Sequence, residues 1–125
     1  MEHVFFSDGN QKQISWAILT GNDIEKQMRD HPENYFDKVT VEQAKYIALH
    51  AGIFWCIGKF IIKNGDAIKV KLDSKSMYDT LRENKETLDS FCNTKINFLN
   101  KLIEQRKLEV KYELISSQKN AAKLS

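Results

Sequence analysis

The segment from Thr40 to Lys63 constrains the fold more than any other part of this sequence. Thr40 and Gln43 stand three residues apart in a capping-box pattern, and Asn64-Gly65 is a typical helix terminator, so we predict one long helix between them. Apolar residues cover most of its circumference. A helix of this kind must be covered on more than one side, by a sheet and by another helix or a partner.

The rest of the chain alternates between strand and helix patterns. The expected strands are 3–10, 14–20, 67–73 and 109–115. The expected additional helices are 75–82, 86–105 and 118–125. Segment 23–30 fits a polar edge strand or a helix. This order predicts an α/β fold with a five-stranded mixed sheet, three antiparallel strands followed by two parallel ones, flanked by helices. We expect a single domain over residues 1–125.

Composition narrows the class of protein without identifying a function. A net charge of +2 permits nucleic-acid contact but does not require it. Cys56 and Cys92 lack metal-type spacing, which favours reduced, buried thiols and a cytoplasmic or nuclear location. The three histidines are scattered and predict no metal cluster. We expect no signal peptide, and no membrane span because the longest apolar stretch is shorter than about 20 residues.

Two of the expected strands carry an aspartate at the carboxyl end, Asp8 where the first strand runs into a turn and Asp73 in the fourth. Neighbouring strands would bring both carboxylates to the carboxyl edge of the sheet, where open α/β sheets place their sites. A simpler interpretation stays open, because Ser-Asp-Gly is a common turn and Asp-Ser is a common helix cap.

Four segments resemble the type I ribonuclease H family, in the right order and over nearly the whole chain. They are Phe6–Asn10 (FSDGN), Thr40–Leu49 (TVEQAKYIAL), Val70–Ser74 (VKLDS) and Ala121–Ser125 (AAKLS). They are similar to the family's Thr-Asp-Gly-Ser strand, its Thr-x-x-x-Ala-Glu-Tyr-x-Ala-Leu helix, its Asp-Ser strand end and its terminal Ala-Asp-x-Leu-Ser. The resemblance implies the family's fold and a site in which acids hold two magnesium or manganese ions at the scissile phosphate.

The chain departs from this pattern at two of the four acidic positions. Asp8 and Asp73 match as catalytic, metal-binding carboxylates, but Lys45 and Ala122 replace the other two acids. An ammonium group at position 45 would form a charge pair with Asp8 or Asp73 and weaken magnesium binding. Glu42, one turn earlier on the helix, is the alternative ligand.

The resemblance also implies where nucleic acid would bind. Backbone amides at Gly9 and Asn10, with the side chains of Asn10, Gln11 and Gln43, would meet a minor groove and its 2′-hydroxyl groups.

Three functions remain open from the sequence. The leading hypothesis is a ribonuclease H-like domain with impaired or lost catalysis and no required metal, which binds RNA, an RNA/DNA hybrid or a protein partner. The alternatives are an active magnesium-dependent endoribonuclease that cleaves the RNA strand of hybrids, and an enzyme engineered to trap substrate. The apolar helix 41–63 is the expected surface for a protein partner or a second copy.

Overall fold

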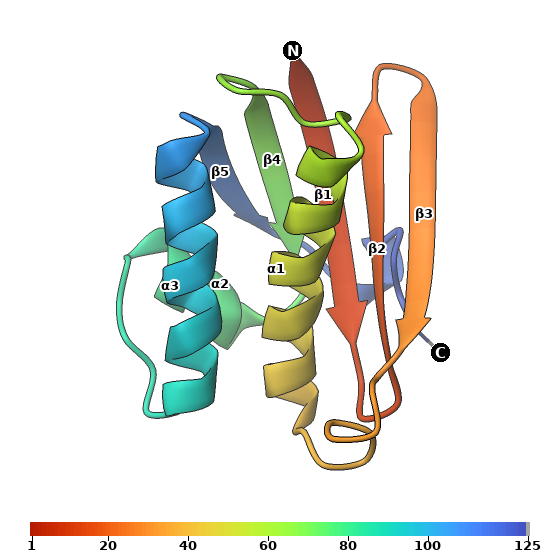
Figure 1. The fold of residues 1–125 in the computed structure, drawn as a ribbon, viewed down its shortest axis with the longest axis vertical. Coiled ribbons are helices and arrows are strands. Elements are labelled where there is room, and N and C mark those ends of the chain that lie inside the picture. The colour runs from red at the N-terminus through yellow and green to blue at the C-terminus, as the bar shows by residue number, and fades with distance from the viewer. Residues whose placement is uncertain (125) are drawn as a thin grey trace.

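A computed structural model describes residues 1–124 of the chain. They form one five-stranded sheet with the strand order β3-β2-β1-β4-β5 (Figure 1). The strands are β1 (Glu2–Gly9), β2 (Gln13–Thr20), β3 (Asp23–Asp30), β4 (Ala67–Leu72) and β5 (Glu109–Leu114). β1, β2 and β3 pair antiparallel, whereas β4 pairs parallel with both β1 and β5. The predicted fold class is therefore confirmed, and segment 23–30 is a strand.

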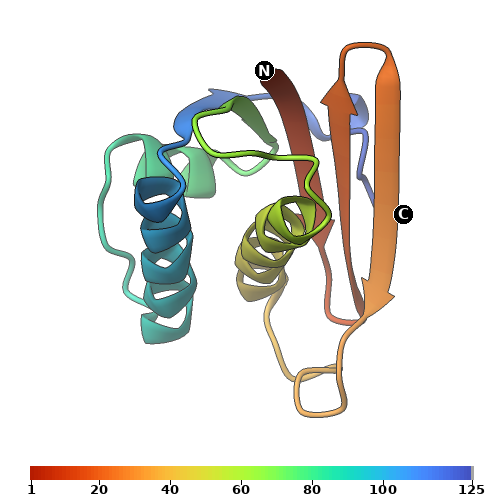
Figure 2. The ribbon, with the colours of Figure 1, turned by 45° about the horizontal axis from the view of Figure 1, so that its top comes forward.

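The helices lie on one face of this sheet. They are α1 (Val41–Gly58), α2 (Lys75–Arg82) and α3 (Ser90–Gln105). Figure 2 shows α1 and α3 on the same side of the sheet, while the residues after β5 pass behind it. The sheet thus has one face covered by helices and one covered only in part, by the C-terminal residues.

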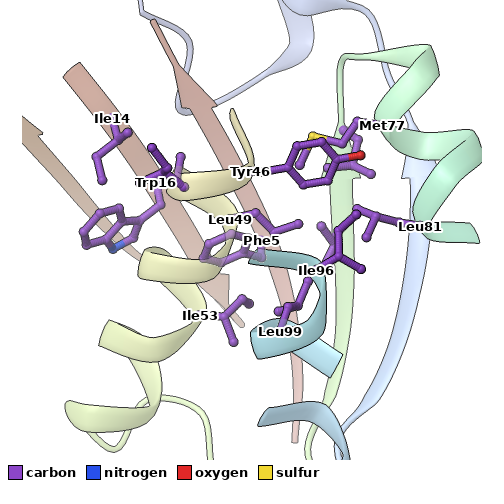
Figure 3. Packing of buried hydrophobic residues seen from close by; sticks show 14 of the residues in the cluster. Phe5, Ile14, Trp16, Tyr46, Leu49, Ile53, Met77, Leu81, Ile96 and Leu99 are labelled. Carbon is purple, nitrogen blue, oxygen red and sulfur yellow. The ribbon is translucent and has the colours of Figure 1, made fainter. Parts of the chain in front are cut away.

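The core lies between the sheet and the two long helices. Phe5, Trp16, Leu49 and Ile53 are nearly inaccessible to solvent and pack together with residues of α3 (Figure 3). α1 contacts β1, β2 and α3, so burial within the chain accounts for most of its apolar surface. Phe54 on its outer side stays 61% exposed. A protein partner or second copy at this helix stays a prediction.

The N-terminus of α1 is the best-predicted boundary. The Thr40 hydroxyl accepts from the Gln43 backbone N–H at 3.0 Å, and the Gln43 side chain accepts from the Thr40 N–H at 2.9 Å. This reciprocal pair satisfies two N–H groups that the helix itself leaves free. The expected capping box is confirmed.

The C-terminus of α1 was predicted five residues too late. The helix ends at Gly58, because Phe60 adopts a left-handed conformation with φ of 60° and the N–H of Ile61 returns to the carbonyl of Cys56. Such a residue is usually glycine, so no local signal marked the end. Gly65, the expected terminator, lies in the loop before β4 with φ of 85°.

Two other helix predictions also need correction. α3 begins at Ser90 rather than Glu86, because the Asp89 side chain accepts from the Phe91 N–H and caps the helix there. The expected helix 118–125 is only a short 3₁₀ turn at Ser117–Lys119. Beyond it the Asn120 side chain, not a helical carbonyl, pairs with the Ala122 N–H. Ser125 lies outside the described residues.

The two cysteines lie in the long helices α1 and α3. Cys56 and Cys92 are buried free thiols, as predicted, and burial raises the pKa of each to about 12. Within residues 1–124, the helices lack the combination of length and hydrophobicity that crossing a bilayer requires.

Candidate functional site

Gly9 sets the geometry of the candidate site. A Cβ atom at this position would overlap with the backbone carbonyl of Ala44, so only glycine lets the end of β1 pass so close to the first turns of α1. This approach places Asp8, the preceding residue, beside Lys45 of α1. The glycine of the Ser-Asp-Gly turn is therefore required by packing between two elements.

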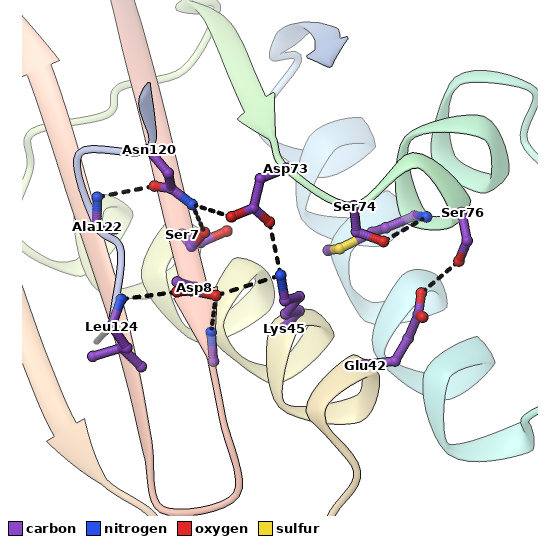
Figure 4. Close-up of polar contacts among 12 residues, drawn as sticks. Ser7, Asp8, Glu42, Lys45, Asp73, Ser74, Ser76, Asn120, Ala122 and Leu124 are labelled. Carbon is purple, nitrogen blue, oxygen red and sulfur yellow. Dashed lines mark hydrogen bonds and ion pairs between the residues drawn. The ribbon is translucent and has the colours of Figure 1, made fainter. Parts of the chain in front are cut away.

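Asp8 and Asp73 lie together at the carboxyl ends of β1 and β4, as the sequence predicted (Figure 4). The parallel pairing of β1 with β4 brings the two strand ends side by side. Both carboxylates are nearly sealed from solvent, with side-chain exposures of 10% for Asp8 and 5% for Asp73. Two carboxylates so placed repel each other unless a cation lies between them.

Lys45 supplies that cation. Its ammonium group is 2.8 Å from Oδ1 of Asp73 and 3.6 Å from Oδ1 of Asp8. Burial alone would lower the pKa of Lys45, but the hydrogen bond and charge of Asp73, with the charge of Asp8, outweigh it and raise the pKa. The charge pair inferred from the sequence is confirmed, and it joins Lys45 to both carboxylates at once.

The remaining carboxylate oxygens also have donors from the chain. Oδ1 of Asp8 accepts from the Gly9 N–H at 2.8 Å, and its Oδ2 accepts from the Leu124 N–H at 2.8 Å. Oδ2 of Asp73 accepts from the Asn120 side-chain amide at 3.1 Å. Each of the four oxygens of the acidic pair is therefore engaged within the protein.

These residues do not fit a two-magnesium site. A divalent ion prefers several free, hard oxygen ligands, and here an ammonium group and amide N–H groups occupy the oxygens. Within the described part of the chain, no three His, Cys, Asp or Glu side chains are arranged to hold a metal ion. The metal-binding role of Asp8 and Asp73 stays a prediction that this arrangement does not favour.

Glu42 does not complete the acidic set. Its Oε1 accepts a hydrogen bond of 2.7 Å from the hydroxyl of Ser76 in α2, and Figure 4 shows its side chain directed toward α2 and away from Asp8.

Ser74 acts as a helix cap, which was the simpler interpretation of the Asp-Ser pair. Its hydroxyl accepts from the Met77 N–H and caps α2. Within the Asp-Ser pair, Ser74 therefore caps α2 and Asp73 belongs to the candidate site.

The four residues expected to meet nucleic acid differ in their availability. The Gly9 amide donates to Asp8, and the Gln43 side chain is used by the capping box and by a 2.8 Å bond to Asp89. The Asn10 side-chain oxygen accepts from the Lys12 and Gln13 N–H groups. Gln11 is exposed. Of the four, Gln11 has the side chain best placed for an outside ligand.

Asn120 is the site residue that sequence reasoning missed. Its side-chain amide donates to the Ser7 carbonyl at 2.9 Å as well as to Asp73, and the residue is 5% exposed. Ala122 follows it in the chain, and its backbone is held on both sides, the N–H by Asn120 and the carbonyl by the hydroxyl of Ser15. An asparagine near a polar chain end carries no local sign of such burial.

Comparison with solved structures shows the fold of this chain, whereas comparisons of its sequence give no match. No protein-family model matches the sequence, and no curated protein sequence matches it either. Among solved structures, the chain is similar to LC11 ribonuclease H1, isolated from compost by a metagenomic approach, with 17% identity, a TM-score of 0.76 and coverage of 96% of this chain and 88% of that one.

Two further structures give the same result. Ribonuclease H1 from the halophilic archaeon Halobacterium salinarum is 16% identical, with a TM-score of 0.70 and coverage of 92% and 84% of the two chains. A structure of LC11 ribonuclease H1 in complex with an RNA/DNA hybrid is 14% identical, with a TM-score of 0.69 and coverage of 96% and 88%. With the strand order and the position of the acidic pair, these matches establish that the chain has the ribonuclease H-like fold.

Proposed function

We propose that this chain is a single ribonuclease H-like domain that binds nucleic acid, with an RNA/DNA hybrid as the favoured ligand, and does not hydrolyse it by a two-metal mechanism. The observation that carries the proposal is the ammonium group of Lys45 between Asp8 and Asp73. The similarity to a ribonuclease H1 whose structure contains an RNA/DNA hybrid supports the choice of ligand.

The argument against two-metal hydrolysis is electrostatic. Metal-assisted phosphate cleavage needs clustered negative ligands that hold two divalent ions and generate an activated water. Two carboxylates and one ammonium leave a net charge of −1 at this site. A lysine ammonium carries one positive charge and donates hydrogen bonds, but it has no open coordination position on which a water could be activated.

Entry of a divalent ion would require several contacts to break together. The ion would have to displace Lys45, and then the Leu124 and Asn120 donors, from oxygens that are already satisfied. The displaced ammonium would remain attached to α1 and would repel the incoming cation. Both costs weaken metal binding relative to a site built from acids alone.

Binding of nucleic acid without cleavage needs fewer conditions. Phosphate contacts supply most of the affinity of such proteins, and the chain has a small positive charge of +2. The exposed Gln11 and the neighbouring Asn10 lie at the turn between β1 and β2, close to Asp8 in the chain. Polar side chains there would contact the sugar and base edges of a minor groove.

The test combines binding and cleavage on one labelled substrate. The wild-type protein is incubated with an RNA/DNA hybrid, single-stranded RNA or duplex RNA, first in chelator and then with magnesium or manganese. We expect saturable binding to the hybrid in chelator and no metal-dependent cleavage. Absence of binding to all three ligands would refute nucleic-acid binding.

The matched variant is the double change Lys45→Glu with Ala122→Asp. It places acids at the two positions where this chain departs from the family pattern. Metal-dependent cleavage by this variant alone would support lost catalysis in the wild-type chain. Cleavage of the RNA strand by the wild-type protein would instead establish the alternative function, an active magnesium-dependent endoribonuclease.

A further inference from the structure

The segment Ser116–Leu124, here named the strap, is held by hydrogen bonds with Ser7, Asp8, Ser15 and Asp73. It contains one short 3₁₀ turn and no other regular element. It lies behind the sheet, away from α1 and α3 (Figures 1 and 2). A segment with so few repeating backbone bonds depends on side-chain contacts to stay in place.

Two of those contacts end on the acidic pair. Asn120 of the strap reaches the Asp73 carboxylate and the Ser7 carbonyl, and the Leu124 N–H reaches Asp8 (Figure 4). The Ser15 hydroxyl, on the strand next to β1, donates to the carbonyl of Ala122. Asn120 and Ala122 are 5% and 7% exposed, so the strap is packed where these bonds form.

We propose that Asp8, Lys45 and Asp73 form an ion-paired latch that keeps the strap closed over the carboxyl ends of β1 and β4. The carboxylates supply two of the acceptors that hold the strap. Lys45, on the other side, neutralises part of their charge and so lets them lie close together. This role concerns the conformation of the chain and does not depend on nucleic-acid binding.

Lys45 affects the strap without contacting it, because it pairs with the two carboxylates that accept hydrogen bonds from the strap. Without the ammonium group, the two carboxylates would repel each other and move apart. Such a movement would lengthen the hydrogen bonds that they accept from Asn120 and Leu124 of the strap. Loss of Lys45 should therefore open the strap before it unfolds the sheet.

Amide hydrogen exchange measured by NMR tests this directly. In Lys45→Met, which keeps the length of the side chain and removes its charge, we expect the Ala122 and Leu124 amides to exchange at least about tenfold faster than in the wild-type chain. Amides in the β1–β4 pairing, such as that of Val70, should keep their protection.

The matched control is Lys71→Met. Lys71 has nearly the same side-chain exposure as Lys45, 22% against 21%, and forms a 3.2 Å ion pair with Glu113 on the neighbouring strand. Its loss should leave exchange of the strap unchanged. Equal acceleration in both variants, or none in Lys45→Met, would overturn the proposal.

A second variant is needed if Lys45→Met lowers the protection of amides from exchange throughout the molecule. Asp8→Ala removes the acceptor of the Leu124 N–H and leaves the Lys45–Asp73 contact in place. Selective loss of protection at Leu124 supports the latch, and full protection at Leu124 in this variant contradicts it.

Discussion

The side chain of Lys45 donates a 2.8 Å hydrogen bond to Asp73, and this contact joins the first turns of α1 to the end of β4. The same ammonium group is 3.6 Å from Asp8. One helix residue thus provides, from within the chain, a positive charge shared by the two carboxylates. The acidic pair therefore holds an internal cation.

This internal cation predicts the response to Lys45→Glu. Three carboxylates without a cation repel each other, so we expect this variant to lose about 2 kcal/mol or more of stability in chelator. Millimolar manganese should restore part of that loss, because a third acid turns the cluster into a divalent-ion site. Thermal unfolding with and without manganese measures both effects.

The control for that experiment is the wild-type chain, whose carboxylates already hold the Lys45 ammonium between them. It should not be stabilised by manganese. A manganese-dependent rise of the wild-type melting temperature as large as that of Lys45→Glu would contradict the internal-cation interpretation.

Gly9→Ala should be among the most damaging single-methyl changes in this chain. The added Cβ meets the backbone of Ala44, which belongs to α1 and cannot move aside as a flexible side chain could. We expect a loss of more than about 2 kcal/mol in urea denaturation. Gly58→Ala is the control, since nothing lies within 4 Å of its new Cβ, and it should change stability by less than about 1 kcal/mol. Similar losses in the two variants would count against the close approach of β1 to α1.

The hydrogen bonds of Asp66 should make part of the free energy of unfolding sensitive to acid. Burial would raise its pKa, but hydrogen bonds from His3, the Lys63 N–H and the N-terminal ammonium outweigh burial and lower it. Because the folded pKa lies below the ordinary value of 3.8, the stabilisation is present above that value and is lost as the pH falls through the folded pKa.

The variant Asp66→Asn isolates this contribution. We expect it to cost about 1–3 kcal/mol near pH 7, where the carboxylate is ionised and accepts from buried donors. The difference in unfolding free energy between the two proteins should stay constant above about pH 5 and shrink below about pH 4. A difference that grows on acidification would show that the pKa of Asp66 is raised.

Gln11→Ala tests the expected nucleic-acid contact at the β1–β2 turn. Loss of one hydrogen-bonding side chain should weaken hybrid binding roughly two- to tenfold in a fluorescence titration at fixed salt. Gln118→Ala, an exposed glutamine of the strap, is the matched control and should leave affinity unchanged. An equal loss in both variants would place the binding surface elsewhere.

Several features of this fold were predictable because their causes lie close together in the sequence. The capping box joins Thr40 to Gln43, three residues later, by two hydrogen bonds. The start of α1 therefore depends only on neighbouring residues in the sequence. The alternating pattern of β4 and the aspartate that follows it likewise placed Asp73 at a strand end. Lys45 could be paired with the acids because the resemblance assigned all three to one site.

The sequence by itself thus determined the order of the elements and the strand ends that carry Asp8 and Asp73, since periodicity and capping act over a few residues. Only the tertiary structure decided where α1 ends and how the strap lies. Phe60 takes a left-handed conformation that its side chain does not favour. Asn120 finds its partners at Ser7 and Asp73, far away in the chain. Contacts of this kind depend on burial and on the approach of distant backbone segments, which no local pattern records.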